Sequence, residues 1–140
     1  MRLVLMMLMV DTDLFGADTA EPTHSRNVEL IKASGVRGGL VVQVGCQEGS
    51  ELAALRVSDA FLVQGLQRDA DAAAATRAWL VDAGLNGRVS VVQFDGARLP
   101  YMDNLVNLLI IDDPDIRVPA AELLRVLSPR GVLAVRDSVA

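Results

Sequence analysis

Glycines and polar residues gather directly after one apolar run near the middle of the chain. Residues 40–44 are apolar apart from Gln43, and Gly45-Cys46-Gln47-Glu48-Gly49 follows them. Such a run is typical of a fully buried parallel strand. The glycines predict a tight turn, and Ser50 then begins a helical pattern, so backbone N–H groups at the turn can face a ligand. The chemistry that this arrangement predicts is the binding of a small molecule.

Three later apolar runs also end in polar residues. Strands are expected at 60–66, 89–94 and 105–111, followed by Gln67-Arg68, Asp95-Gly96 and Asp112-Asp113. In an open parallel sheet, ligands bind beyond the carboxyl ends of the strands, near the point where the strand order reverses. We therefore expect these turns to converge on one crevice. Asp95 and the Asp112-Asp113 pair also fit ordinary solvated turns, and that interpretation stays open for them.

Helical patterns alternate with these strands and would position them. Helices are expected at 25–34, 50–57, 69–83 and from Pro119 onward, and a fifth strand at 132–135. This alternation predicts right-handed βαβ units and a parallel sheet. In the alanine-rich helix 69–83, Trp79 is expected on the inner face.

Composition narrows the functional classes. With 140 residues, 51% hydrophobic and 4% aromatic, the chain predicts one domain with an aliphatic core. The net charge of −5, without a cluster of basic residues, argues against nucleic acid as a partner. The single cysteine, Cys46, excludes an intrachain disulfide and a cysteine-based zinc site, and no metal site is predicted. No histidine stands where it could activate Cys46, so Cys46 is not predicted to be a nucleophile.

Residues 1–22 are expected to lie outside the domain, which is predicted to span residues 23–140. Arg2 followed by the apolar residues 3–10 resembles a very short signal peptide, and the run is too short to span a bilayer. Two interpretations of 1–22 stay open, an extension outside the fold and a weak secretion signal. The location is therefore not fixed by the sequence.

Four segments, taken in order, resemble class I S-adenosylmethionine-dependent methyltransferases over roughly residues 25–137. They are VVQVGCQEG (41–49), FLVQGLQRD (61–69), VVQFDGARLPYMDNLVNLLIIDD (91–113) and ELLRVLSPRGVLAV (122–135). The resemblance implies a Rossmann-like three-layer α/β/α fold with a mostly parallel sheet of strand order 3-2-1-4-5. More narrowly, LPYMDNLVNLL resembles the methyltransferase-like domain fused to quinoprotein-like β-propeller repeat proteins.

The resemblance also implies roles for residues of the four turns. S-adenosylmethionine would be the cofactor, with Gln67 at the ribose, Asp95 at the adenine amino group, and Asp112 and Asp113 facing the substrate. The remaining cofactor-binding positions that it implies are Gly45, Cys46, Gln47, Gly49 and Gly96. It implies no metal, and it names no catalytic residue or methyl acceptor.

Three glutamines depart from the family's pattern. Gln43 replaces the acid of the first strand, Gln47 the middle glycine and Gln67 the ribose-binding acid. A neutral amide offers one acceptor oxygen where a carboxylate offers two. Two functions therefore stay open: a methyltransferase, which would work in the cytoplasm where its cofactor is made, and a degenerate, non-catalytic module that serves assembly or supports a fused propeller. A nicotinamide-binding domain is disfavoured because G-x-G-x-x-G spacing is missing and no acid ends the second strand.

The family's sheet has seven strands, and this chain predicts five, without the last two. An apolar edge at Gly131 to Val135 would then be open, which invites pairing. We expect this edge to be covered by a second copy of the chain or by a downstream segment.

Overall fold

Ten helices and strands make up the part of the chain that the computed structural model describes, residues 4–8, 22–45, 48–113 and 115–136. In chain order they are β1 (Val4–Leu8), α1 (Pro22–Ser34), β2 (Gly39–Val44), α2 (Gly49–Leu55), β3 (Phe61–Gln67), α3 (Ala70–Asp82), β4 (Val89–Gln93), β5 (Val106–Ile111), α4 (Ala120–Val126) and β6 (Leu127–Arg136). The expected helices and strands therefore all form, with ends that differ by a few residues.

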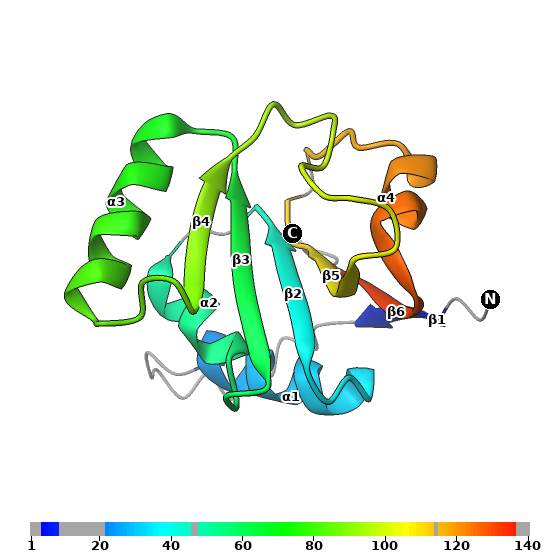
Figure 1. Cartoon of the computed structure of the whole chain (residues 1–140), viewed down its shortest axis with the longest axis horizontal. Coiled ribbons are helices and arrows are strands. Elements are labelled where there is room, and N and C mark those ends of the chain that lie inside the picture. The colour runs from blue at the N-terminus through cyan, green and yellow to red at the C-terminus, as the bar shows by residue number, and fades with distance from the viewer. Residues whose placement is uncertain (1–3, 9–21, 46–47, 114, 137–140) are drawn as a thin grey trace.

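All six strands form one parallel sheet in the order β1-β6-β5-β2-β3-β4 (Figure 1). The five predicted strands correspond to β2 through β6, and their order 3-2-1-4-5 is confirmed. The chain leaves β2 toward β3 on one side and later returns to β5 on the other. The order of strands therefore reverses at the β2–β5 boundary, where a crevice is expected in this type of sheet.

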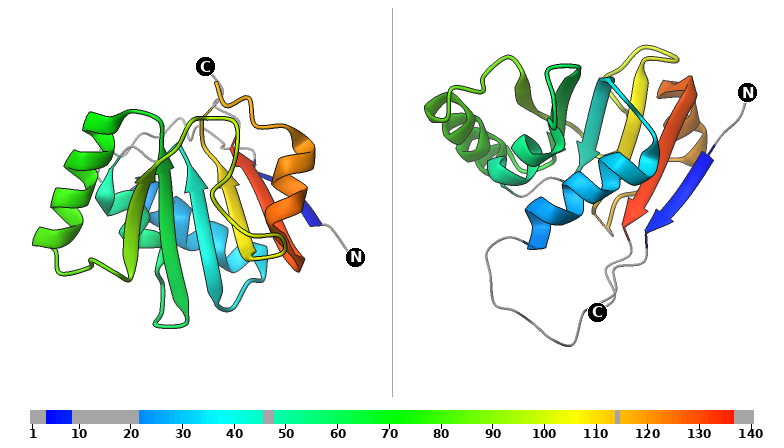
Figure 2. Two further views of the ribbon diagram at one scale, coloured as in Figure 1. Left: turned by 45° about the horizontal axis from the view of Figure 1, so that its top comes forward. Right: turned by 90° about the horizontal axis from the view of Figure 1, so that it is seen from below.

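Helices cover the two faces of the sheet unequally (Figure 2). On one face, side chains of α1, α2 and α3 pack with alternate strand residues in a cluster that includes Leu30, Leu52 and Leu80. On the other face, Val126 of α4 packs with Leu99 and Phe94 of the segment after β4. That segment therefore contributes to the core as well as to the crevice.

The predicted inner face of α3 is wrong. Asp69 caps this helix by accepting a hydrogen bond from the Asp71 backbone N–H at 3.0 Å. The buried residues are Ala73, Thr76 and Leu80, whereas Trp79 is 43% exposed. In a helix that consists mostly of alanine the apolar periodicity is weak, so the sequence pattern does not fix which side faces the sheet.

The expectation of an open edge beside residues 131–135 is also wrong. Val4–Leu8 forms β1, which pairs with β6 in parallel, with Val4 opposite Val132 and Leu8 opposite Arg136. The chain's own N-terminal strand therefore occupies this edge, in place of a second copy or a downstream segment. An apolar run of five residues in a strand places no constraint on its partner along the chain, so the pairing is a long-range property.

Candidate functional site

The turn after β2 requires a glycine at its first position. Gly45 has φ +88°, and its N–H donates to the carbonyl of Leu66 at 2.9 Å. A Cβ at position 45 would lie 2.5 Å from the Cβ of Asp113. Glycine is therefore needed both for the left-handed backbone and for the close approach of the turn after β5. Cys46 and Gln47, the next two predicted residues, lie outside the described residues.

Gly49 has an equally specific structural reason. It begins α2, and a Cβ there would lie 2.5 Å from Cε3 of the Trp79 ring. The absence of a side chain lets the indole lie against the start of α2. The two described glycines of this motif are thus explained by contacts within the protein, whether or not a ligand binds.

A buried polar network lies at the carboxyl ends of β2, β5 and β6. Gln43 is fully buried, and its Nε2 donates to Oδ2 of Asp112 at 3.0 Å. Arg136 donates to the same oxygen at 3.2 Å and also to Oδ1 of Asn27. Asn27 in turn donates to the carbonyl of Glu51 at 2.6 Å, which ties α1 and α2 to the sheet. Sequence analysis missed Asn27 and Arg136, because only the fold brings them to Asp112.

This network gives a structural reason for the glutamine at position 43. Asp112 receives an N–H from Gln43, and a carboxylate at position 43 would instead face Asp112 with a like charge. Oε1 of Gln43, by contrast, is buried and has no hydrogen-bond partner among the described residues. A buried acceptor without a donor is costly, so this oxygen favours a donor such as an internal water molecule.

An ion pair crosses the crevice. Arg68 follows β3, Asp113 follows β5, and β2 lies between these strands. Nη2 of Arg68 lies 2.8 Å from Oδ2 of Asp113, and the two side chains are 45% and 19% exposed. The pair therefore passes over the carboxyl end of β2, where the strand order reverses. The predicted substrate residues Asp112 and Asp113 are both engaged with arginines.

The turn after β4 is organised by Asp95. Its Oδ1 accepts the backbone N–H groups of Ala97 and Arg98, at 2.8 and 3.0 Å. These hydrogen bonds lower the pKa of the Asp95 carboxyl below its usual value, first through Arg98 and then through Ala97. Gly96 has φ +90°, and a Cβ there would lie 2.9 Å from Cδ of Arg68. Arg68 thus lies between this turn and Asp113.

The last predicted cofactor residue, Gln67, is at the end of β3. Its Oε1 accepts the N–H of Asp69 at 3.3 Å, beside the start of α3. The structure therefore brings Gly45, Gln67, Asp95, Gly96 and Asp113 to the same edge of the sheet.

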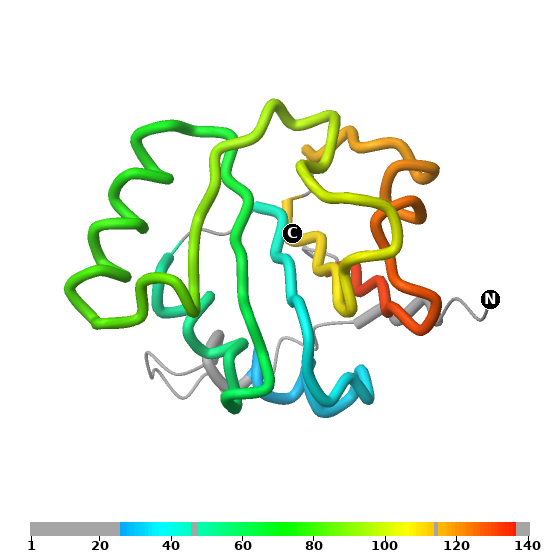
Figure 3. Tube along the Cα trace, in the orientation of Figure 1, coloured from blue at the N-terminus to red at the C-terminus, as the bar shows by residue number. Residues whose placement is uncertain are grey.

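Helix α4 clamps the segment that carries Asp95 and Gly96. Glu122 accepts the Leu99 N–H at 3.0 Å, and Arg125 donates to the Leu99 carbonyl at 3.2 Å and to the Tyr101 carbonyl at 2.8 Å. Arg125 also pairs with Asp103 at 2.8 Å and with Glu122 at 2.6 Å. Figure 3 shows the segment between β4 and β5 reaching across to lie beside α4. The sequence shows the Glu and Arg of the ELLR segment, but only the fold shows that these two side chains bind the backbone of Leu99 and Tyr101.

Titration behaviour follows from these contacts. Hydrogen bonding to Arg125 lowers the pKa of Glu122 to about 2. Hydrogen bonding to Glu122 and then Asp103 raises the pKa of Arg125. Burial raises the pKa of Tyr101, whose hydroxyl contacts Oε1 of Gln64. Glu122 and Arg125, which form the clamp, are therefore both charged at neutral pH. Tyr101 is neutral, and its hydroxyl anchors the segment to Gln64 of β3.

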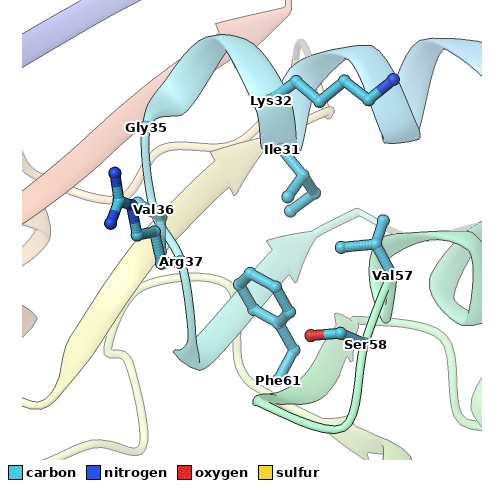
Figure 4. Close-up of a pocket in the computed structure, with 8 residues that line it drawn as sticks. All are labelled: Ile31, Lys32, Gly35, Val36, Arg37, Val57, Ser58 and Phe61. Carbon is cyan, nitrogen blue, oxygen red and sulfur yellow. The ribbon is translucent and has the colours of Figure 1, made fainter.

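A hollow of about 490 Å³ lies at the opposite end of the sheet (Figure 4). Its apolar centre is formed by Ile31, Val57 and Phe61, and Lys32 and Arg37 lie at its margins. It is bounded by the end of α1, the loop after α2 and the start of β3. In parallel α/β sheets ligands bind at the other end, so this hollow is not the predicted crevice.

Two features are absent from the described part of the chain. No group of three or more His, Cys, Asp or Glu residues there could hold a metal ion. None of its helices is long and apolar enough to cross a membrane.

Comparison with known proteins relates the chain to methyltransferases through structure alone. No protein-family profile matches it, and no curated protein matches its sequence. A methyltransferase from Aquifex aeolicus described as SAM-dependent has 21% identity and a TM-score of 0.71, over 84% of this chain and 67% of its own. Geranyl diphosphate C-methyltransferase from Streptomyces coelicolor A3(2), solved with Mg²⁺, geranyl diphosphate and S-adenosyl-L-homocysteine, has 16% identity and a TM-score of 0.68, over 80% of this chain and 45% of its own. The chain therefore has the fold of class I S-adenosylmethionine-dependent methyltransferases.

A third similar structure limits what the fold implies. The [4+2]-cyclase SpnF has 24% identity and a TM-score of 0.69, over 80% of this chain and 43% of its own. The same architecture thus occurs in a protein named for a cyclisation, and a fold by itself does not determine the reaction. This chain also spans only part of each of these proteins, so the activity of the whole proteins does not follow from the similarity.

Proposed function

We propose that this domain binds S-adenosylmethionine at the carboxyl ends of β2, β3 and β4 and transfers its methyl group to an acceptor that the crevice does not identify. The observation that carries the proposal is the turn of Asp95 and Gly96. Oδ1 of Asp95 is committed to the turn, and the structure gives Oδ2 no partner among the described residues. The lowered pKa keeps this carboxylate charged, so Oδ2 suits an exocyclic amino group of adenine.

The other residues fit the cofactor less completely. Gln67 is proposed to face the ribose, but its neutral carbonyl oxygen already accepts the Asp69 N–H. Arg68 lies across the crevice and would have to swing away. Since its side chain is flexible, 45% exposed and held by one exposed ion pair, such a movement costs about 1 kcal/mol or less.

Methyl transfer from S-adenosylmethionine would need few catalytic groups from the protein. When bound, S-adenosylmethionine would supply an activated methyl group, and a bond from the methyl carbon to a nucleophilic acceptor atom would form as the carbon–sulfur bond breaks and S-adenosylhomocysteine leaves. The chain's own residues would then hold the cofactor and acceptor in line and exclude water. Asp112 and Asp113 are proposed to face the acceptor, and no catalytic base is assigned. A working enzyme would be expected in the cytoplasm, where the cofactor is made.

The second candidate is a non-catalytic module that keeps the fold for assembly or for supporting a fused β-propeller. The Arg68–Asp113 pair favours it, because protein side chains occupy part of the crevice that the cofactor would need. The motif glycines favour neither candidate, because internal packing alone explains Gly45 and Gly49.

Calorimetric titration separates the candidates. S-adenosylmethionine and S-adenosylhomocysteine should bind at micromolar concentration, and NAD should not. The Arg68→Ala variant should bind more tightly than the unsubstituted chain, whereas Arg88→Ala, at an exposed arginine outside the crevice, should match it. If neither the chain nor Arg68→Ala binds either nucleoside, the cofactor proposal fails and the non-catalytic module is favoured. Binding restored by Gln47→Gly would show a site that has decayed.

A further inference from the structure

The segment between β4 and β5 has no helix of its own to fix its position. Residues 94–105 connect the two strands, and the local hydrogen bonds of Asp95 span only Ala97 and Arg98. Two residues of this segment, Asp95 and Gly96, are those on which the proposed adenine contact depends. The Phe94 N–H ties the start of the segment to β3 by donating to the Gln67 carbonyl at 3.1 Å. Further support from outside the segment then holds the residues that follow Asp95 and Gly96.

Side chains of α4 provide that support. Both backbone polar groups of Leu99 are satisfied by this helix, the N–H by Glu122 and the carbonyl by Arg125. Arg125 extends the contact to the Tyr101 carbonyl and the Asp103 carboxylate. The backbone continues it, since Asn104 donates to the carbonyl of Arg125 at 2.9 Å.

The two clamp residues also hold each other in place. Nε of Arg125 lies 2.8 Å from Oε2 of Glu122, and Nη2 lies 2.6 Å from Oε1. This is a fork-shaped pairing, which fixes the guanidinium plane. The other guanidinium hydrogen bonds go to the carbonyls of Leu99 and Tyr101 and to the carboxylate of Asp103. Leu99 is buried between α4 and the sheet, so the clamp is anchored in the core.

We propose that Glu122 and Arg125 are positioning residues for adenine recognition, which hold the segment 95–101 so that Asp95 and Gly96 face the crevice. They act through Leu99 and Tyr101 and touch no ligand themselves. The inference rests on the proposed function, which supplies the adenine. It goes beyond that function by assigning a role to two residues of α4, a helix that the proposed cofactor site does not include.

The direct test compares two ligands that differ at one edge of the purine, where the amino group and the acceptor N1 of adenine become a carbonyl oxygen and an N1–H. S-adenosylhomocysteine carries the adenine amino group, and S-inosylhomocysteine carries an oxygen in its place. A hydrogen bond from that amino group to a charged carboxylate should favour the first ligand by about tenfold or more. The affinity ratio therefore reports the placement of Asp95, and it is insensitive to a general loss of stability that weakens both ligands alike.

Arg125→Lys is the informative variant. Lysine keeps the charge but cannot reach Glu122, Leu99 and Tyr101 together. The ratio should fall toward one, and the Leu99 amide should exchange with solvent about tenfold faster or more, while amides of β2 keep their protection. Glu122→Gln keeps an acceptor for the Leu99 N–H and should show a smaller change of both quantities. Arg88→Lys, at an exposed arginine away from α4, should change neither.

Distinct outcomes decide the two proposals. Unchanged exchange of Leu99 in Arg125→Lys overturns the positioning role, and so does a looser segment with an unchanged affinity ratio. If neither the unsubstituted chain nor Arg68→Ala binds either ligand, the proposed cofactor function fails. The adenine role fails with it, and the exchange data then report the clamp as purely structural.

Discussion

The two sides of the crevice are built in different ways. The segment after β4 is held by a buried leucine, by a fork-shaped ion pair and by backbone hydrogen bonds to α4. The other side consists of the single ion pair between Arg68 and Asp113, which passes over the end of β2 and is called the bridge below. The first side makes many contacts with the core, so displacing it requires a large free energy. Breaking the single ion pair of the second side requires little. A ligand would therefore meet a rigid wall on the β4 side and a movable one on the β3–β5 side.

The largest effect is expected from the core anchor of the rigid side. Leu99→Ala removes a side chain that is 1% exposed and should lower the free energy of unfolding by about 2–5 kcal/mol. Met102→Ala, three residues away and 78% exposed, should change it by no more than about 0.5 kcal/mol. Urea unfolding measures both. Equal effects would contradict the view that Leu99 anchors the segment.

The buried network beneath the bridge predicts the next largest effect. Gln43→Glu places a second carboxylate about where Nε2 now lies 3.0 Å from Asp112, and it should cost about 1–3 kcal/mol at neutral pH. Burial and the like charge of Asp112 both raise the folded-state pKa of the new carboxyl above its unfolded value. The full decrease in the free energy of unfolding should therefore be seen at neutral pH, and it should become smaller as the pH falls below the raised pKa.

The control for Gln43→Glu is the same change beside an uncharged partner. In an Asp112→Asn background the added carboxylate meets no like charge, so the pH dependence should weaken to the part that burial at position 43 causes by itself. A pH-independent loss in both backgrounds would point to altered packing in place of charge repulsion.

A smaller effect is expected from the ion pair of the clamp as the pH changes. The pKa of Glu122 is lowered to about 2 from a usual value of 4.5, so its pairing stabilises the fold above pH 4.5 and is lost as the pH falls toward 2. The unfolding midpoint of the chain should exceed that of Glu122→Gln at neutral pH, and this gap should close over that range. Glu29→Gln, at an exposed position on α1, should show no such gap. A gap independent of pH would mean that the charge of Glu122 contributes nothing.

The smallest effect is expected at the bridge. Arg68→Ala should change the free energy of unfolding by less than about 1 kcal/mol, and the change should decrease further at high salt. Urea unfolding at low and high ionic strength tests this. A larger, salt-insensitive loss would show that both sides of the crevice are rigid, and the comparison between them would no longer hold.

Local sequence was sufficient for much of the fold. The apolar run that ends at Gly45 is a buried central strand, and the polar residues after β3, β4 and β5 do reach the same edge of the sheet. Period and turn chemistry encode such features within a few residues, so they can be read one segment at a time. The same local reading failed at Trp79, because an alanine-rich helix shows little contrast between its faces. It also failed at Val4–Leu8, whose partner strand lies more than a hundred residues away.

The candidate site divides in a similar way. The types of its residues, a glycine turn after β2 and an aspartate after β4, are visible in the sequence, and so is the order in which the chain supplies them. The tertiary structure decided what those residues contact: Asp113 beneath Gly45, Arg68 across β2, Asp112 beside Gln43, and Leu99 within reach of Glu122 and Arg125. Strand identity depends on the chemistry of neighbouring residues along the chain, whereas these contacts depend on which strands and helices become neighbours in space. The balance of burial and charge that sets them exists only once the sheet has formed.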